Sequence, residues 1–350
     1  MYTEDAVQTY FASGDLKHEP LLEALNRPTL PLTDALSGVD PFDSATLQQS
    51  IVNMVMQTYG SLSKIAAISR DFFNGTHQRL PTVSKLRFEQ DLQSLTTSPS
   101  AGFAALCLSI LLMQQMPMGK ATNMQSSLYF KVKNVITLLE TTGDLSLDLV
   151  HCRVLVSFYE MGHGLHRAAY LSLAGCARAA RVLGLHKKRW RDLQADSDKL
   201  ALEEEKRTWW AIVLMDRFIN LCNGDAFFVT ENPARTDPLP VEDLLWSESL
   251  SRADLESLIA AAPLLDTPFN ITVGQLAREC QISHLAGHVV RHVYDPLPDT
   301  SINTEEATQL ERTLKAYLPL LSNEELRIGK YCGAYGMCNR CAVLSSSSTT

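Results

Sequence analysis

The sequence has little of several features that mark specialised classes of protein. Eight cysteines in 350 residues are too few for a disulfide scaffold. The longest apolar run, residues 103–113, is interrupted by Ser109 and is about half of the ~20 residues that a membrane-spanning helix needs. The first residues are acidic, whereas a signal peptide begins with basic residues. These absences predict a soluble intracellular protein that does not interact with a membrane.

An excess of positive charge is missing as well. The chain has 31 Lys and Arg against 39 Asp and Glu, which gives a formal net charge of −8. Because an acidic surface repels phosphate, nucleic-acid binding by the whole surface is excluded, and a separate basic module would be needed. Hydrophobic residues make up 45% of the chain, close to the globular average, so a large core is available.

Common catalytic motifs are also missing. The sequence contains no G-x-S-x-G, no phosphate-binding loop, no dinucleotide fingerprint, no H-E-x-x-H and no D-D-x-x-D. We therefore predict that the chain is not an enzyme, and we assign no catalytic, cofactor-binding or metal-binding residue.

Apolar residues recur at steps of three and four over most of the chain, which predicts helices. The first expected helix begins near Ile51. Further helices are expected at residues 103–116, 128–140, 147–161, 166–183, 203–222, 252–261, 272–293 and 304–318. No segment of period two is bounded by strand turns, so no sheet is expected. The predicted fold class is all-α.

Prolines and a serine-rich end set the predicted domain boundaries. Four prolines interrupt any helical period within residues 1–48, which we interpret as an irregular leader. The last ten residues end in six Ser or Thr and are expected not to pack, and residues 331–350 are predicted to be a polar tail. Residues 49–330 then form one large helical domain.

The most specific motifs lie in two stretches. Upstream, Phe72-Phe73 is followed by His77, by Pro81 and by S-K-x-R-F at residues 84–88. Downstream, residues 176–186 contain Arg178 and end in Leu-Gly-Leu-His around Gly184. Further on stand the E-x-x-x-R-x-W-W segment at residues 203–210, an Asp-Arg pair and a closing Leu-Pro.

In this order and spacing, the motifs resemble those of the fungal-specific transcription factor domain, which is the regulatory middle region of fungal zinc-cluster activators. The resemblance covers about residues 65–245 and extends to about 330. It implies that the family-motif positions, which we expect to be structural, are Phe73, His77, Pro81, Arg178, Gly184, Arg207, Trp209, Trp210, Asp216, Arg217 and Pro240. One departure is Gly224-Asp225-Ala226, where members of the family often carry Gly-Arg-Pro.

The resemblance implies control of transcription in a fungal nucleus, often of genes for a secondary metabolite. The helical region would then hold an activator silent, bind a small-molecule effector, or form a homo- or heterodimer. Members usually begin with a six-cysteine zinc cluster that binds DNA, whereas the first cysteine here is Cys107. We therefore expect promoter DNA to be reached through a partner or a zinc cluster missing from this chain, and zinc only in such a segment.

Residues of the downstream motif are interpreted as core. Trp209 and Trp210 lie about 100° apart on a helix, so both are buried only where the helix is contacted on two sides. Ordinary core packing is favoured over the wall of a ligand pocket. Arg207 and Asp216 are expected to be buried, and their charges must then be paired.

A helix face offers the strongest competing interpretation. Cys280, His284, His288 and His292 follow at steps of four, and neighbours at this spacing can share a metal. The four positions drift by about 120° over a rise of ~18 Å, so one helix offers at most two ligands. The alternative function is therefore a cytosolic all-α metal-dependent enzyme. A third possibility is a DNA-binding-deficient partner that interferes with an intact regulator.

Three weaker patterns are most simply structural. Cys332, Cys338 and Cys341 have the spacing C-x5-C-x2-C, but a second pair of zinc ligands is missing. Residues 187–191 are basic and fit a solvated loop better than a nuclear-import or phosphate contact. Residues 241–259 mix acidic and apolar side chains, as activation segments and surface helices both do.

Overall fold

The computed structural model describes residues 44–115, 124–187, 198–243, 246, 257, 259, 262–328 and 333–347. Among these residues the regular structure is helical, with one isolated antiparallel bridge between Pro238 and Leu264. The prediction of an all-α fold is confirmed. Most of the helix expected at 252–261 lies outside the described residues.

The helices follow one another in a simple order along the chain. They are α4 (Ser44–Tyr59), α5 (Leu62–Asn74), η1 (Thr76–Gln78), α6 (Lys85–Ser94), α7 (Ala101–Met113), α8 (Ser127–Thr141), α9 (Leu147–Gly162), α10 (His166–Val182), η2 (Leu185–Lys187), α11 (Lys199–Asn223), α14 (Gln275–Tyr294), α15 (Thr300–Ile328) and α16 (Gly333–Ser347).

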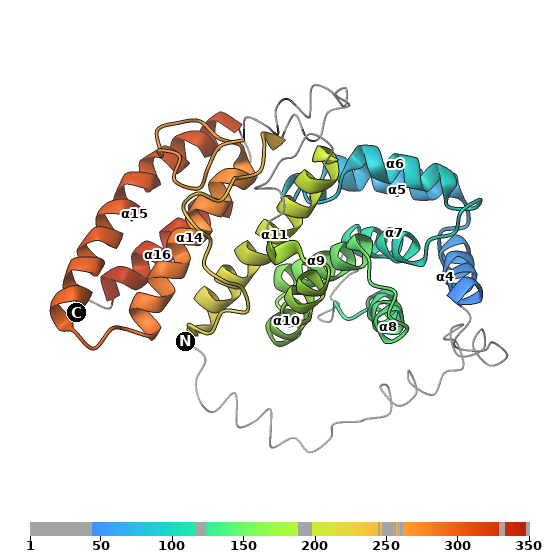
Figure 1. Ribbon diagram of the computed structural model, residues 1–350, viewed down its shortest axis with the longest axis horizontal. Helices are drawn as coiled ribbons and strands as arrows, with labels where there is room; N and C mark the ends of the chain where they lie inside the picture. The colour runs from blue at the N-terminus through green and yellow to red at the C-terminus, as the bar shows by residue number, and fades with distance from the viewer. Residues whose placement is uncertain are drawn as a thin grey trace, which may run out of the picture.

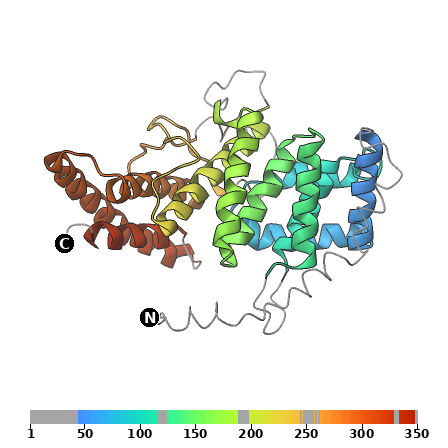
Figure 2. The same ribbon diagram turned by 90° about the horizontal axis from the view of Figure 1, so that it is seen from below.

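The molecule is elongated, and its helices are arranged along the long axis roughly in sequence order (Figure 1). Helices α4 to α8 lie at one end and α14 to α16 at the other, with α9, α10 and α11 between them (Figure 2). The three larger apolar clusters of the described core follow the same order: one within α4–α9, one around α9–α11 and one between α11 and α14–α16. In the described part of the chain, no helix combines the length and apolar character needed to span a bilayer.

Helix α7 is the centre of the first cluster. Eleven of its 13 residues are buried, as expected for a helix that is apolar nearly all round. The buried hydroxyl of Ser109 donates to the carbonyl of Ala105 at 3.0 Å, so it adds no unsatisfied polar group. The helix begins after Ser100, whose side chain accepts from the N–H of Phe103. The helix expected at residues 103–116 is therefore present, although it begins at Ala101 and ends at Met113.

The apolar residues expected in the first helix, which was predicted to begin near Ile51, are divided between the two helices α4 and α5. Gly60 has φ +85 between α4 and α5, and this left-handed conformation favours glycine. Helix α4 also begins at Ser44, inside the range predicted as irregular leader. Leu47, which is 7% exposed, joins Ile51 and Val55 on one buried stripe because the three lie at steps of four.

The C-terminal segment requires a larger correction. Residues 331–350 were expected to form a tail that does not pack, but α16 covers Gly333–Ser347. Its buried residues, Ala334, Met337, Cys338 and Cys341, follow at three- and four-residue steps and pack on α14 and α15. The spacing of these apolar residues therefore makes the segment a packed helix, although several serines follow them.

Introducing a carboxylate at two adjacent positions of α16 tests this packing. Cys338→Asp places a charge where the side chain is 0% exposed, and should lower the free energy of unfolding by several kcal/mol. Asn339→Asp places the same charge on an exposed neighbour and should change it by less than about 0.5 kcal/mol. Urea unfolding measures both; equal, small effects would mean that the segment is an unpacked tail.

Candidate regulatory core

Helix α11 carries most of the downstream motif and is buried along most of its 25 residues. It begins after Asp198, whose carboxylate accepts from the N–H groups of Leu200 and Ala201. It ends at Gly224, which has φ +70, a common helix C-cap conformation. Charged side chains are rarely fully buried unless they are paired, yet several on α11 are at most 2% exposed: Glu203, Glu204, Lys206, Arg207, Asp216 and Arg217.

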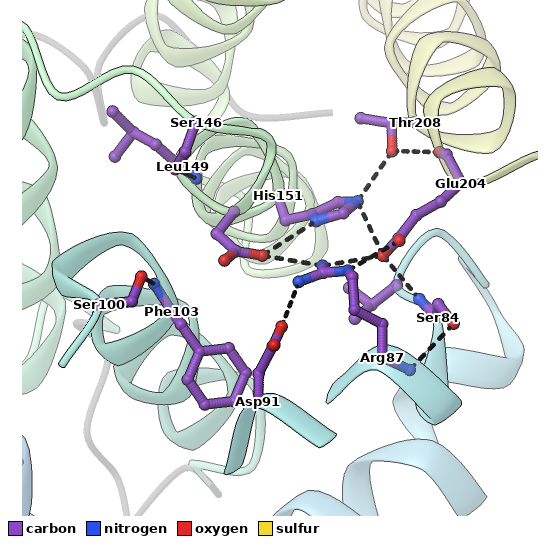
Figure 3. A network of polar contacts seen from close by, with 12 residues as sticks. Ser84, Arg87, Asp91, Ser100, Phe103, Ser146, Leu149, His151, Glu204 and Thr208 are labelled. Atoms are coloured by element: carbon purple, nitrogen blue, oxygen red, sulfur yellow. Dashed lines mark hydrogen bonds and ion pairs between the residues drawn. The ribbon is translucent and has the colours of Figure 1, made fainter. Parts of the chain in front are cut away.

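Glu204 accepts hydrogen bonds from the upstream motif (Figure 3). Arg87 on α6 donates from Nε and Nη2 to its two carboxylate oxygens, each at 2.9 Å. The backbone N–H of Ser84 donates to Glu204 Oε1 at 2.8 Å. Arg87 also pairs with Asp91 and with Asp148 on α9, each at 2.8 Å. Arg87 therefore joins α6 to α11 through the bidentate pair with Glu204, and to α9 through Asp148.

His151 completes this network from α9. Its Nε2 lies 2.8 Å from the hydroxyl of Thr208, and that hydroxyl donates to the carbonyl of Glu204 at 2.7 Å. Because Thr208 has only one proton to donate, His151 Nε2 must be the donor to Thr208. The ring is 0% exposed, and its nitrogens lie 4.0 Å from Asp148 and from Glu204. The imidazole is thus hydrogen-bonded through Nε2, while Nδ1 lies beyond hydrogen-bond distance of Asp148.

Arg207 forms a second network with segments before and after α11. Its Nε donates to Glu203 at 2.9 Å, its Nη1 to Asp243 at 2.8 Å, and its Nη2 to the carbonyl of Val241 at 2.6 Å. Nη1 also reaches the carbonyl of Pro81 at 3.2 Å. The guanidinium is 0% exposed and fully paired, as the sequence predicted for a buried charge here.

The two tryptophans of the motif are buried on different sides of α11. Trp209 is 3% exposed and lies near His186, with ring centroids 6.3 Å apart. Trp210 is 2% exposed, and its indole N–H donates to the carbonyl of Pro238 at 3.1 Å. Both side chains belong to the central apolar cluster. Contact on two sides of the helix is what the adjacent pair predicted.

Asp216 and Arg217 form a third network near the end of α11. Asp216 accepts from Arg217 Nη1 at 2.7 Å and from the N–H and hydroxyl of Thr230 at 2.9 and 2.6 Å. Asn220 donates to the same carboxylate at 2.9 Å. Arg217 also donates to the carbonyl of Glu231 at 2.9 Å. Burial lowers the pKa of Arg217 to about 10, while the charge of Asp216 acts in the opposite direction.

The other positions of the family motif are spread through the fold. Phe73 is buried with its ring 4.8 Å from His77, and Pro81 and Pro240 are buried close to the Arg207 network. Gly184 has φ +81 after α10, a left-handed conformation that favours glycine at the end of a helix. Arg178 is exposed on α10. The motif is therefore not one cluster around a reaction centre.

His77 links the upstream motif to the start of α6. Its Nε2 donates to the carbonyl of Val83 at 2.9 Å, and the ring is 1% exposed. Burial lowers the pKa of His77 to about 3, and the nearby charge of Arg207 lowers it further, while the hydrogen bond to Val83 opposes the shift. The imidazole is therefore neutral at physiological pH and serves as a hydrogen-bond donor within the core.

The candidate metal face of α14 is divided by the structure. Cys280 is 0% exposed in the central apolar cluster, and burial raises the pKa of its thiol well above the usual range. His284 and His288 lie with ring centroids 4.8 Å apart, whereas His292 pairs with Glu306 at 3.0 Å. Among the described residues, no group of three or more His, Cys, Asp or Glu side chains has the geometry of a metal site.

The remaining weak patterns lie partly outside the described residues. Cys332, residues 188–191 and most of residues 244–259 fall there, whereas Cys338 and Cys341 are buried in the C-terminal cluster.

Sequence reasoning did not identify the partners of Glu204. A helix was expected to begin at residue 203, but α11 begins at Lys199, and Glu203 and Glu204 are buried one turn further in. Arg87 lies in the S-K-x-R-F segment named above. Asp148 and His151 belong to no motif, because they lie on a helix whose pattern is simply amphipathic. The available indication was an acidic residue within an otherwise apolar stretch of a helix.

These networks can hold helices together, but they offer no reaction centre. The first two join α11 to segments distant in the sequence, and the third joins it to the loop around Thr230; the charges that they contain are paired and largely removed from water. Such networks favour one arrangement of the helices over others, because each misplaced helix leaves a buried charge unpaired.

Comparisons with known proteins agree with this description. The family model described as "Fungal specific transcription factor domain" matches residues 70–318. The chain is 31% identical to "Transcription factor BOA15" of Botryotinia fuckeliana over 145 residues, which is 41% of this chain and 79% of that protein. No solved structure matches the chain.

Two further relatives match over shorter shares of their length. "Transcription factor asqA" of Emericella nidulans is 32% identical over 88 residues, covering 25% of this chain and 15% of that protein. "Transcription factor tazR" of Aspergillus terreus is 24% identical over 221 residues, covering 58% of this chain and 34% of that protein. Most of the length of these two relatives therefore lies outside the match.

Removing Arg87 tests the first network. Arg87→Ala leaves the carboxylate of Glu204, 1% exposed, without its bidentate partner, which should cost about 3–5 kcal/mol. Lys315→Ala removes the partner of Glu311 from a pair whose side chains are 70% and 49% exposed, and should cost less than about 1 kcal/mol. Urea unfolding compares the two; similar losses would show that the Arg87 network is not a structural constraint.

The buried imidazole of His77 should make stability depend on pH. The pKa of His77 is about 3 in the folded chain and about 6.5 for a free side chain, so below pH 6.5 only the unfolded chain binds this proton. Its contribution to stability decreases as the pH falls from 6.5 towards 3, by about 1.4 kcal/mol per pH unit. His77→Gln keeps a donor for Val83 and should flatten this slope.

Exposed His166 provides the control for that measurement. His166→Gln should leave the dependence of unfolding free energy on pH as it is in the unmodified chain. Identical slopes for all three proteins between pH 4 and 6.5 would contradict the assignment of a depressed pKa to His77.

Proposed function

The chain belongs to the family of the fungal specific transcription factor domain, and from this premise we propose that it regulates transcription in a fungal nucleus. Its relatives are transcription factors by name. The observation that carries the proposal is the extent of the match: it runs from residue 70 to 318 and includes the residues that hold α11 to its neighbours.

The regulatory role rests on binding surfaces rather than on chemistry. Arg207, Asp216 and Arg217 lie in buried networks that attach α11 to the segments around Pro81, Val241 and Thr230, so they maintain a framework on which partners or effectors act. A net charge of −8 does not favour direct contact with DNA. We propose that promoter DNA is reached through a homo- or heterodimeric partner or through a zinc cluster in a segment that this chain does not contain.

The target genes proposed for this regulator are those of a biosynthetic cluster for a secondary metabolite. This finer assignment is supported by the resemblance to the family, because members of the family often regulate such clusters. A chain that lacks DNA binding of its own could instead interfere with an intact regulator, and the direction of the transcript change distinguishes the two roles.

Within the part of the chain that the structure describes, no contact favours the metal-dependent enzyme as a second function. A site on α14 would need Cys280, whose thiol is buried in the apolar core, or His292, which already pairs with Glu306. His284 and His288 remain as a pair on one helix, which supplies too few ligands for a structural or catalytic site.

Transcript levels after gene deletion test the proposal. Deletion should change expression of a set of co-located biosynthetic genes, and the unmodified chain should restore it. Arg207→Met should fail to restore it, because Glu203 and Asp243 then lose their shared buried cation. His284→Ala together with His288→Ala should restore it as well as the unmodified chain does.

Protein abundance and location are measured in the same strains. The protein should accumulate in the nucleus. If deletion leaves all transcripts unchanged, or if the double histidine variant loses function at normal abundance together with bound zinc, the regulator assignment fails. Increased expression on deletion would identify an interfering role in place of an activating one.

A further inference from the structure

A cavity of about 340 Å3 lies where the central helices meet the C-terminal helices. Its walls come from α9, α11, α14 and α16 and from the residues that follow η1. Ligand pockets commonly measure about 300–1,000 Å3, so the volume suits a small molecule. None of the family-motif positions lines it.

The lining is apolar apart from one end. Phe158 and Met161 on α9, Leu214 and Phe218 on α11, and Met337 on α16 form the apolar walls. The polar end carries Glu279 and Gln275 on α14, with Arg79 after η1. A site of this kind binds by excluding water from apolar surface and selects by its few polar groups.

Glu279 is the group that gives this cavity chemical specificity. Its side chain is 6% exposed and accepts from Gln275 Nε2 at 3.3 Å and from the backbone N–H of Gly333. Burial raises the pKa of Glu279 to about 7, against the lowering effect of these hydrogen bonds and of Arg79, while the charge of Asp243 raises it further. Near neutral pH the carboxyl group therefore occurs in both protonation states.

The chemistry of the lining narrows the class of occupant. A full charge on the ligand would lose its hydration against the apolar walls, which is costly unless the charge is paired. A hydroxyl group is neutral and can both donate and accept, so it pairs with Glu279 whether the carboxyl is ionised or protonated. A carbonyl pairs only with the protonated carboxyl, and an N–H donor cannot accept the proton of that state.

We propose that this cavity binds a small, neutral, largely apolar molecule through one hydroxyl group that contacts Glu279. The role of such a molecule as an effector rests on the proposed function, whereas binding itself does not. An occupant touches α9 and α11 on one side and α14 and α16 on the other, so it favours the arrangement in which the C-terminal helices are docked on the centre.

The matched pair 2-naphthol and naphthalene tests both parts of the proposal with the purified full chain. Equilibrium dialysis should show one saturable site for 2-naphthol, with an affinity at least tenfold higher than that for naphthalene. Glu279→Leu removes the polar contact and should bring the two affinities within about twofold of each other. A tenfold ratio corresponds to about 1.4 kcal/mol, the scale of one hydrogen bond.

Filling the cavity tests its location. A Cβ added at Gly162, which lines the cavity, meets no atom within 4 Å, so Gly162→Phe introduces its side chain from an open position. It should lower the affinity for 2-naphthol at least tenfold, and Leu214→Trp should do the same from α11. Gly162→Ala is the matched control and should bind like the unmodified chain. Circular dichroism and thermal unfolding establish that each variant is folded.

The outcomes separate the site from the regulator. The proposal is overturned if 2-naphthol shows no saturable binding, if both filling variants bind it with unchanged affinity, or if the preference over naphthalene survives Glu279→Leu. Normal binding together with unchanged transcripts after gene deletion would refute the regulatory function and leave the site intact. Loss of binding in Gly162→Phe with normal transcript control would refute the effector role alone.

Discussion

The bidentate pair between Arg87 and Glu204 is the contact on which the arrangement of the helices most depends. It joins α6 to α11 across 117 residues of sequence, and Asp148 brings α9 into the same contact. Because Glu204 is 1% exposed, any arrangement that separates it from Arg87 leaves a charge buried in an apolar surrounding. Apolar packing by itself does not select one neighbouring helix over another, so this charge pair specifies which helices meet.

Two further networks repeat this principle along α11. Arg207 fastens the first half of the helix to the segments around Pro81 and Val241, and Asp216 fastens the second half to the loop around Thr230. The central helix is thus attached by paired charges at intervals, with the tryptophan pair between them.

The sequence was enough to identify the family, whereas the partners of the buried charges were visible only in the structure. The order and spacing of short motifs were enough to identify the family, and the requirement that buried charges be paired correctly anticipated the environments of Arg207 and Asp216. The partners themselves could not be named, since Asp148, Asp243 and Thr230 are ordinary residues in sequence. The cavity beside Glu279 had no sequence signal, because its walls come from five separate elements.

Local order was determined by the sequence alone: the all-α class, the apolar α7, the left-handed turn at Gly184 and the burial of both tryptophans follow from periodicity and residue type. These properties depend on neighbours a few positions away. Only the tertiary structure decided that α16 packs instead of forming a tail, that Cys280 turns into the core, and that Glu279 faces a cavity. The physical reason is that each of these outcomes depends on which distant helix supplies the opposing surface, and periodicity carries no information about that choice.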